Sequence, residues 1–151
     1  MTSSEPVPVV VCAVGEQHYA ILVADILEVA ALVQLTPLPE APPELVGVVN
    51  RRGEVLPILD LRLCLGQQAG PLDLATLFVV VQAGEQQAGL IVDDVLEVAT
   101  LPAQAFRLPA HSGPYVRGMA TAGQQPLLVL DVAALLQAFA PVELPVERQA
   151  S

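Results

Sequence analysis

The sequence contains no lysine and no tryptophan, and its six basic residues are all arginines. Its 16 aspartates and glutamates give a formal net charge of −10. Proteins bind nucleic acid largely through clusters of basic residues at the phosphates, so we expect no nucleic-acid partner. The absence of lysine also excludes a lysine-containing phosphate loop, Schiff-base chemistry and Ser–Lys catalysis.

Long hydrophobic runs are missing as well. No apolar stretch of the sequence approaches the roughly 18 residues that a membrane-spanning helix needs. No basic residue precedes the first apolar run, as one would in a signal peptide. We therefore expect a cytoplasmic chain with no direct membrane insertion. Hydrophobic residues make up 54% of the 151 residues and charged ones 15%, which suits a single folded domain.

Cysteine and histidine are scarce, with two residues of each. Cys12 and Cys64 lie in apolar segments far apart in the sequence, so we expect buried free thiols and neither a disulfide nor a metal site. His18 and His111 have no oriented nucleophile in the pattern around them and are interpreted as surface or turn residues. No catalytic constellation emerges, and we expect no enzyme activity and no cofactor.

Acidic residues cluster at Asp93-Asp94-x-x-Glu97. Adjacent strand residues point to opposite faces of a sheet, so this pair is poorly arranged to chelate a cation. We expect Asp25 and Asp93-Asp94 to cap single helical turns, and Asp60 and Asp131 to cap the short apolar stretches after them. A metal site is not expected.

The chain repeats itself. The segment Gly15–Ala30, GEQHYAILVADILEVA, returns at Gly84–Ala99 as GEQQAGLIVDDVLEVA with nine identical positions, an offset of 69 residues. VGVVNRRGEVLPILDL at 46–61 is echoed by VRGMATAGQQPLLVLDV at 116–132. Two equivalent substructures are predicted.

Each copy is rich in short β-branched segments separated by turn residues, which predicts an all-β fold. About five strands per copy suit a small closed barrel, because closure leaves no exposed edges. We expect one domain over residues 8–140, with a first repeat at about 15–66 and a second at about 76–140, between flexible tails at 1–7 and 141–151. The expected strands are 9–14, 19–23, 29–35, 46–49, 55–59, 76–81, 88–92, 96–101, 116–120 and 127–130.

One hairpin carries charge in only one copy. Arg51 and Arg52 lie in the predicted loop Asn50–Gly53, whose counterpart Thr121-Ala122-Gly123 is uncharged. The fold therefore does not require these arginines, which leaves them free to meet an acidic partner surface. A solubilising loop is the alternative, because exposed ion pairs contribute only about 0–1 kcal/mol.

The run from Leu27 to Leu61 contains Glu28-Val29, Pro39, Gly47-Val48-Val49-Asn50-x-Arg52-Gly53 and Pro57-x-x-Asp60-Leu61. The second half continues with Gly89-x-x-Val92-Asp93 and a terminal leucine helix. This ordered set of motifs resembles the CheW adaptor family. The resemblance implies two SH3-like five-stranded barrels that share a core, with short helical turns and a C-terminal helix. It implies a non-catalytic adaptor that couples methyl-accepting chemoreceptors, at their cytoplasmic tips, to a CheA-type histidine kinase in membrane receptor arrays.

The resemblance also suggests which residues bind each partner. Ile26, Glu28 and Gly47 match positions linked to the kinase contact, and Arg107 matches a second kinase contact. The receptor contact is expected at the hairpin loop, through Asn50, Arg52 and Gly53.

The role of Glu28 and the choice between two functions stay open at the sequence level, and Gly47 offers a test of the kinase contact. Glu28 is repeated as Glu97, so a structural role such as pairing within a turn competes with the kinase contact. If Gly47 serves the kinase, Gly47→Asp should abolish kinase binding and leave the thermal midpoint nearly unchanged. A ligand-sensing or inhibitory module of the same family, binding receptor or kinase without coupling them, is the alternative function.

Overall fold

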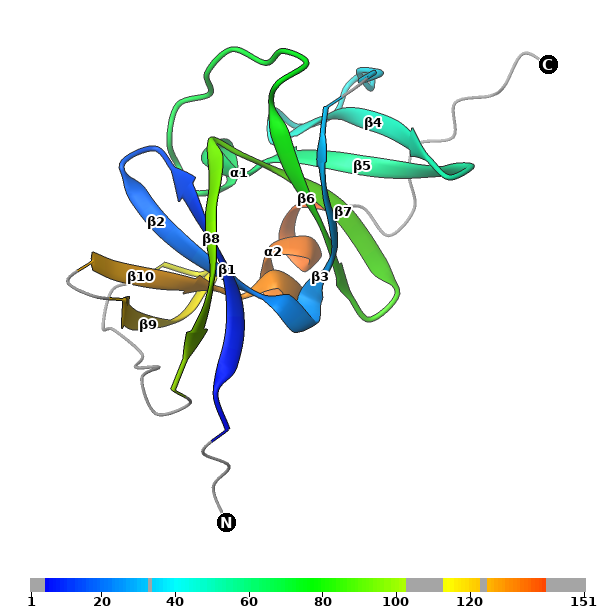
Figure 1. The fold of residues 1–151 in the computed structure, drawn as a ribbon. Helices are drawn as coiled ribbons and strands as arrows, with labels where there is room; N and C mark the ends of the chain where they lie inside the picture. The colour runs from blue at the N-terminus through cyan, green and yellow to red at the C-terminus, as the bar shows by residue number, and fades with distance from the viewer. Residues whose placement is uncertain (1–4, 33, 103–112, 123–124, 141–151) are drawn as a thin grey trace.

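The computed structural model describes residues 5–32, 34–102, 113–122 and 125–140 of the chain. They form ten strands in two five-stranded sheets, three short helical segments and their connections. Figure 1 shows the sheets curled into two small barrels, with the last helix between them. The fold class predicted from the sequence is confirmed. Among the described residues, no helix is long and apolar enough to cross a membrane.

The first sheet has the order β8-β1-β2-β10-β9 and the second the order β3-β6-β7-β5-β4. A strand overlaps each of the ten predicted ones, and eight are one or two residues longer than expected. The strand predicted at 46–49 is three residues longer, and the one predicted at 29–35 begins three residues earlier and ends four residues earlier. The bounds of the ten strands are β1 Val7–Val14, β2 Gln17–Leu22, β3 Ile26–Ala31, β4 Leu45–Arg51, β5 Glu54–Asp60, β6 Leu77–Ala83, β7 Gln86–Val92, β8 Asp94–Leu101, β9 Val116–Ala122 and β10 Gln125–Leu130.

The two sheets are related strand by strand. Exchanging every strand for its counterpart in the other repeat converts one sheet order into the other. The counterparts are β1 and β6, β2 and β7, β3 and β8, β4 and β9, and β5 and β10. The pairing is equivalent too, because β10 runs parallel to β2 as β5 runs parallel to β7. The predicted pseudo-symmetry is thus present in the topology.

The division of the barrels at the repeat boundary, about 15–66 and 76–140, needs correction. The first sheet joins β1 and β2 with three strands of the second repeat, and the second sheet joins β3, β4 and β5 with β6 and β7. A three-residue 3-10 helix, Val23–Asp25, carries the chain from the first sheet into the second. The sequence period shows which residues are buried but does not specify the neighbouring strand, so this exchange between the repeats could not be predicted from it.

Strands β1 and β6 are buried on both faces, and their alternate residues enter different cores. In β1, Val9 and Val11 pack inside their own barrel, whereas Val10, Cys12 and Val14 belong to a central core between the barrels. In β6, Phe78 and Val80 face the second barrel, and Val79 and Val81 face the central core. These β-branched runs therefore hold the two barrels together.

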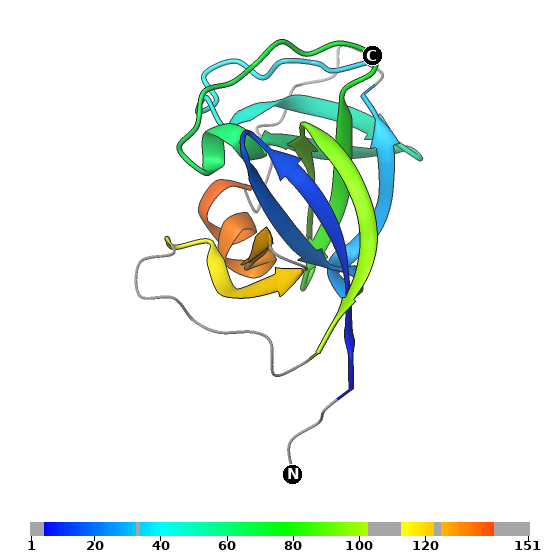
Figure 2. The ribbon, with the colours of Figure 1, turned by 60° about the vertical axis from the view of Figure 1, so that its left-hand side comes forward.

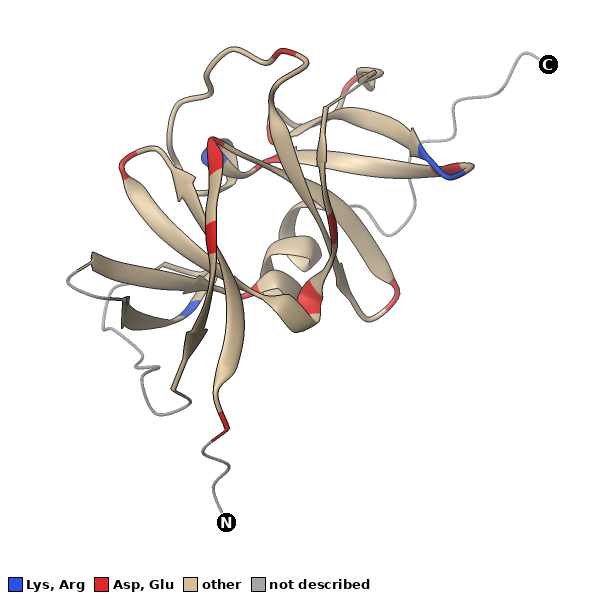
Figure 3. Ribbon diagram, in the orientation of Figure 1, with Lys and Arg blue, Asp and Glu red and all other residues tan. Residues whose placement is uncertain are grey.

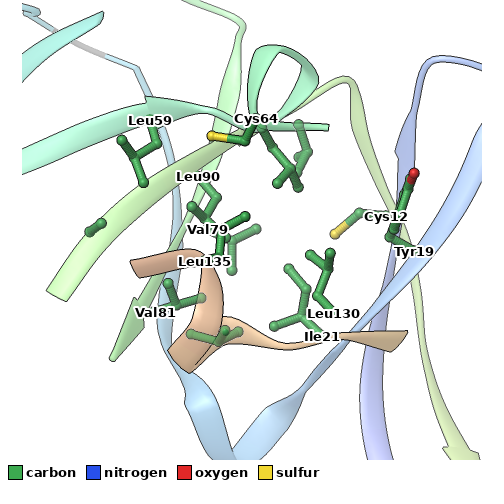
Figure 4. Packing of buried hydrophobic residues seen from close by; sticks show 14 of the residues in the cluster. Cys12, Tyr19, Ile21, Leu59, Cys64, Val79, Val81, Leu90, Leu130 and Leu135 are labelled. Carbon is green, nitrogen blue, oxygen red and sulfur yellow. The ribbon is translucent and has the colours of Figure 1, made fainter. Parts of the chain in front are cut away.

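Two helices complete the central core. Helix α1, Leu61–Cys64, follows β5, and helix α2, Val132–Phe139, follows β10. Leu135 and Leu136 of α2 are fully buried. Figure 1 shows α2 between the two sheets, and Figure 2 shows it at one side of the molecule. Figure 4 shows side chains of both sheets and of α2 converging in the central core. Cys12 and Cys64 are buried free thiols, as predicted.

The predicted caps are confirmed at two of the four places. Asp60 and Asp131 accept hydrogen bonds from backbone amides in the first turns of α1 and α2. Asp25 instead ends its 3-10 helix, which has no side-chain cap. Asp93 caps no helix: its carboxylate accepts from the Gly15 amide at 2.6 Å and lies 3.4 Å from the Arg62 guanidinium. Of the predicted tails at 1–7 and 141–151, residues 1–4 and 141–151 lie outside the described residues, and Val7 is already part of β1.

Candidate functional site: the β4–β5 hairpin and strand β3

The hairpin between β4 and β5 turns through two residues, Arg52 and Gly53. Arg51 pairs with Glu54 across the last rung, and the two loop residues have φ of 55° and 83°. Positive φ at both loop positions is typical of the two-residue turns that match the twist of a hairpin. Asn50 accepts a hydrogen bond from the Gly53 amide at 3.0 Å through its side-chain oxygen. Asn50 and Gly53 therefore shape this loop, as the sequence suggested.

The carboxylate of Glu28 lies between the two arginines of the hairpin. Its Oε2 accepts from Arg51 Nε at 2.6 Å, and its Oε1 lies 3.2 Å from Arg52 Nη2. The side chains of Arg51 and Glu28 are 17% and 28% exposed, whereas that of Arg52 is 74% exposed. The hydrogen bond from Arg51, together with the charges of both arginines, lowers the pKa of Glu28. Strand β3 is thereby tied to the hairpin tip.

These contacts resolve part of what the sequence left open. Arg52 is solvent-exposed at a hairpin tip, as predicted, and Figure 3 shows the tip in blue at one end of the molecule. Glu28 and Arg52 were assigned to different partners, yet their side chains lie together. Arg51, which the sequence offered only as a second charge, makes the shorter and less exposed contact with Glu28.

The second repeat shows what the hairpin needs for folding. Ala122 pairs with Gln125 as Arg51 pairs with Glu54, which aligns Ala122 with Arg51 and Gly123 with Arg52. A glycine thus occupies the sequence position where Arg52 adopts a positive φ, a conformation that disfavours residues with a Cβ. Among the described side chains, Glu97, the counterpart of Glu28, forms no ion pair. The Glu–Arg–Arg cluster is therefore specific to the first repeat.

Gly47 has a structural role that is visible in its contacts. It is buried in β4, and a Cβ built there would lie 2.5 Å from the backbone oxygen of Thr36. Thr36 forms an isolated bridge to Val48, which brings the segment after β3 alongside β4. The expectation that Gly47→Asp would leave the thermal midpoint unchanged is wrong, because no side chain fits beneath that segment. Whether Gly47 also serves a kinase contact stays a prediction.

The remaining predicted site residues lie apart from the hairpin tip. Ile26 begins β3, pairs with Val81 and packs half-buried against the central core. Arg107 lies outside the described residues. The structure thus brings together Glu28, Asn50, Arg52 and Gly53, whereas Ile26 lies at the start of β3, two residues before Glu28.

Sequence reasoning missed four exposed apolar residues of β3 and β8. Leu27, Val29, Leu96 and Val98 are exposed, Val98 by 70%. Val29 pairs with Val79, and Val98 pairs with Val10, both of which belong to the central core. These side chains therefore extend the central core to the surface on both barrels. The repeated Leu-Glu-Val, with apolar residues alternating outward, was the signal that could have revealed them.

A buried arginine was missed as well. Arg62 forms a two-pronged pair with the Asp60 carboxylate, Nε–Oδ1 and Nη2–Oδ2 both at 2.9 Å, and also approaches Asp93. Asp60 is 1% exposed. Hydrogen bonding to Asp60 raises the pKa of Arg62. Because Ala133 replaces it in the second repeat, a comparison of the two Asp-x-x stretches would have indicated it.

Few of the described side chains are suited to catalysis or to metal binding. No group of three or more His, Cys, Asp or Glu side chains in this part of the chain is placed to hold a metal ion. Burial raises the pKa of Cys12 and Cys64 to about 12, so neither thiol is a ready nucleophile. The arrangement is suited to binding: a cationic tip, an exposed apolar strip on β3 and β8, and a rigid shared core.

Known proteins with the same features place the chain in a family. The family model described as CheW-like domain matches residues 8–140. The chain belongs to the CheW-like domain family. It is 31% identical to the chemotaxis protein CheW of Klebsiella aerogenes over 128 residues, which cover 81% of this chain and 76% of that protein. It is 32% identical to protein FrzA of Myxococcus xanthus, covering 82% of this chain and 81% of that protein.

A solved structure supports the same assignment. The crystal structure of the scaffolding protein TtCheW from Thermoanaerobacter tengcongensis matches with a TM-score of 0.78 and 28% identity. The match covers 83% of this chain and 89% of that one. The CheW-like fold and family predicted from the run Leu27–Leu61 are confirmed, and the relationship is to scaffold proteins.

Proposed function

We propose that this chain is a non-catalytic adaptor that couples methyl-accepting chemoreceptors to a CheA-type histidine kinase. Membership of the CheW-like domain family supports this proposal, and the similar solved structure is described as a scaffolding protein. The observation that carries it is Arg52, a 74% exposed arginine in a left-handed turn position where the second repeat has glycine. Because arginine is unfavourable in this turn and is not needed for folding, we attribute its presence to a contact outside the chain.

The receptor contact of the proposal consists of a charged tip and an apolar strip. Arg52 supplies the exposed guanidinium, and Asn50 and Gly53 fix the loop that presents it. Leu27 and Val29 of β3 lie on the strand that Glu28 ties to this hairpin. An apolar helical receptor tip with an acidic side chain would satisfy both features, because apolar contact supplies affinity and charge complementarity supplies register.

The kinase contact is assigned to Ile26, Glu28, Gly47 and Arg107. In this assignment Gly47 acts by allowing the segment at Thr36 to lie against β4, and Ile26 acts at the start of β3. The chain would then hold receptor and kinase at once on a rigid body and would work within cytoplasmic receptor arrays. No bond is made or broken in this role.

A bridging experiment tests the proposal. An immobilised receptor cytoplasmic fragment is incubated with the kinase, with this chain, and with both, and the retained kinase is measured. The adaptor role predicts that kinase is retained well above background only when this chain is present. An inhibitory module would bind one partner and block retention, and that result would contradict the proposal. Arg117→Ala, which removes an exposed arginine away from the hairpin, should bridge like the wild type.

A further inference from the structure

The Glu28 carboxylate has two oxygens, and each is occupied by a different arginine. Arg51 donates from Nε to Oε2 at 2.6 Å, and Arg52 reaches Oε1 with one terminal nitrogen at 3.2 Å. The first contact is shorter and its two side chains are mostly shielded from water, whereas Arg52 is 74% exposed. Exposed ion pairs are weak because water and salt compete for both charges. Arg51 is therefore the principal partner of Glu28.

The two arginines also differ in where the backbone places them. Arg51 is the last residue of β4 and is fixed by its pairing with Glu54. Arg52 is in the turn itself, and its long side chain is 74% exposed and contacts Glu28 through one terminal nitrogen only. A guanidinium binds a carboxylate best through two parallel hydrogen bonds to both oxygens. While Arg51 holds Oε2, Arg52 is denied that two-pronged geometry.

From this competition we infer that Arg51 is a positioning residue: by occupying Glu28, it keeps the Arg52 guanidinium available for the receptor. The inference rests on the proposed function, because it assigns Arg52 to the receptor contact. Without Arg51, both oxygens of Glu28 are open to Arg52, which then folds back onto β3. Glutamate is ionised at neutral pH, and the two arginines lower the pKa of Glu28 further, so its carboxylate is charged there.

The second repeat agrees with a role outside folding. It keeps a glutamate at position 97 but has Ala122 where Arg51 stands, and its turn carries no charge. Where there is no exposed arginine to keep available, there is no second arginine to occupy the glutamate. The pair Arg51–Glu28 thus occurs together with the exposed Arg52 and is absent from the hairpin without it.

A rescue experiment tests the inference with the full chain and a receptor cytoplasmic fragment. Arg51→Leu retains an apolar stem and leaves Arg52 intact, and it should weaken receptor binding about fivefold because Arg52 is now held by Glu28. Adding Glu28→Gln to Arg51→Leu should restore the affinity to within about twofold of the Glu28→Gln variant alone, because nothing then holds Arg52. A purely structural role for Arg51 predicts no such rescue.

A second readout does not depend on the receptor. Proton exchange at Arg Nε–H, followed by NMR, should be slow for Arg51 and fast for Arg52 in the wild type. In Arg51→Leu the Arg52 proton should become protected, and in the double variant it should be exposed again. If Arg51→Leu fails to fold, Arg51→Lys replaces it. Its single ammonium cannot reproduce the directed Nε contact, so the inference predicts partial protection of Arg52 and a smaller loss of affinity.

The outcomes separate the two proposals. Unchanged receptor affinity in Arg51→Leu, an absent rescue, or an Arg52 proton that stays unprotected would each overturn the positioning role. If Arg52→Ala leaves receptor binding unchanged, the receptor assignment of the proposed function fails, and the positioning role fails with it. Arg51→Leu then still shows by NMR whether Arg51 holds Glu28.

Discussion

Arg52 and Gly47 have opposite relations to their backbone positions. Arg52 adopts φ of 55°, and a side chain in this region costs about 1–2 kcal/mol relative to glycine. Gly47 occupies a place where a Cβ would meet the Thr36 backbone oxygen at 2.5 Å. The first residue is present despite the local conformation, and the second is required by it. We therefore assign a role in binding to Arg52 and a role in stability to Gly47.

We predict that Gly47→Ala lowers the free energy of unfolding by about 2–3 kcal/mol, because the new methyl group must displace backbone and not a flexible side chain. Gly84→Ala is the matched control, since Gly84 has φ of 62° and open space around it. The control should lose only about 1 kcal/mol, from backbone conformation alone. Urea unfolding measures both. Equal losses would show that the close approach at Thr36 carries no energy.

Both thiols have a pKa raised from 9.0 to about 12 by burial. A raised pKa in the folded state means that the stability contribution is complete below pH 9.0 and is lost as pH rises towards 12. We predict that unfolding by urea becomes easier between pH 8 and about pH 10.5. The loss should be smaller in a variant with both Cys12→Ala and Cys64→Ala. An identical loss in that variant would assign the alkaline sensitivity to other groups.

The two helices that follow equivalent strands in the two repeats are stabilised differently. Helices α1 and α2 both begin at an aspartate cap, but among the described side chains only Asp60 of the two caps pairs with a buried arginine. Arg62 reaches Asp60, Asp93 and the Gly70 carbonyl, and Asp93 in turn holds the Gly15 amide of the β1–β2 turn. This network links the end of β5 to the hairpin of the other sheet.

We predict that Arg62→Ala lowers the free energy of unfolding by about 3 kcal/mol, since it leaves the Asp60 carboxylate buried without its partner. Arg117→Ala removes an exposed arginine and should change stability by less than about 0.5 kcal/mol. Chemical denaturation of the two variants, side by side, provides the measurement. A loss at Arg62 no larger than that at Arg117 would contradict the structural role of the network.

The strands were predictable because short β-branched runs between turn residues usually form β-strands. The caps Asp60 and Asp131 were predictable from the apolar stretches after them. The exchange of strands between repeats was not, because periodicity shows burial and not the neighbouring strand. In the site, the hairpin and the exposure of Arg52 followed from a charge present in one copy only. The Arg51–Glu28 contact did not, because 23 residues separate its partners.

At the scale of the whole molecule, the exchange makes one folding unit of two repeats. Each sheet takes strands from both halves, and α2 packs in a core that both sheets line. A rigid body of this kind holds two partner surfaces in a fixed relation, as a coupling protein must. It also implies that neither half contains a complete sheet.

We predict that fragments 1–70 and 71–151 are each unfolded alone, because each lacks strands that its own strands pair with. Mixing the fragments should restore β-sheet circular dichroism and a cooperative thermal transition. A cooperative transition in either isolated fragment would contradict the mutual dependence of the two sheets.

In the proposed function, the β4–β5 hairpin couples receptor to kinase through Arg52, and a single substitution there separates this role from the stability of the turn. Arg52→Asn removes the charge and inserts a residue that two-residue hairpin loops favour, so the chain should be as stable as the wild type or up to about 1 kcal/mol more stable. Receptor-stimulated kinase activity of this variant is measured beside its thermal melt. The account predicts an unchanged or raised melting midpoint together with loss of receptor-stimulated activity. Full stimulation by the stable variant would contradict it.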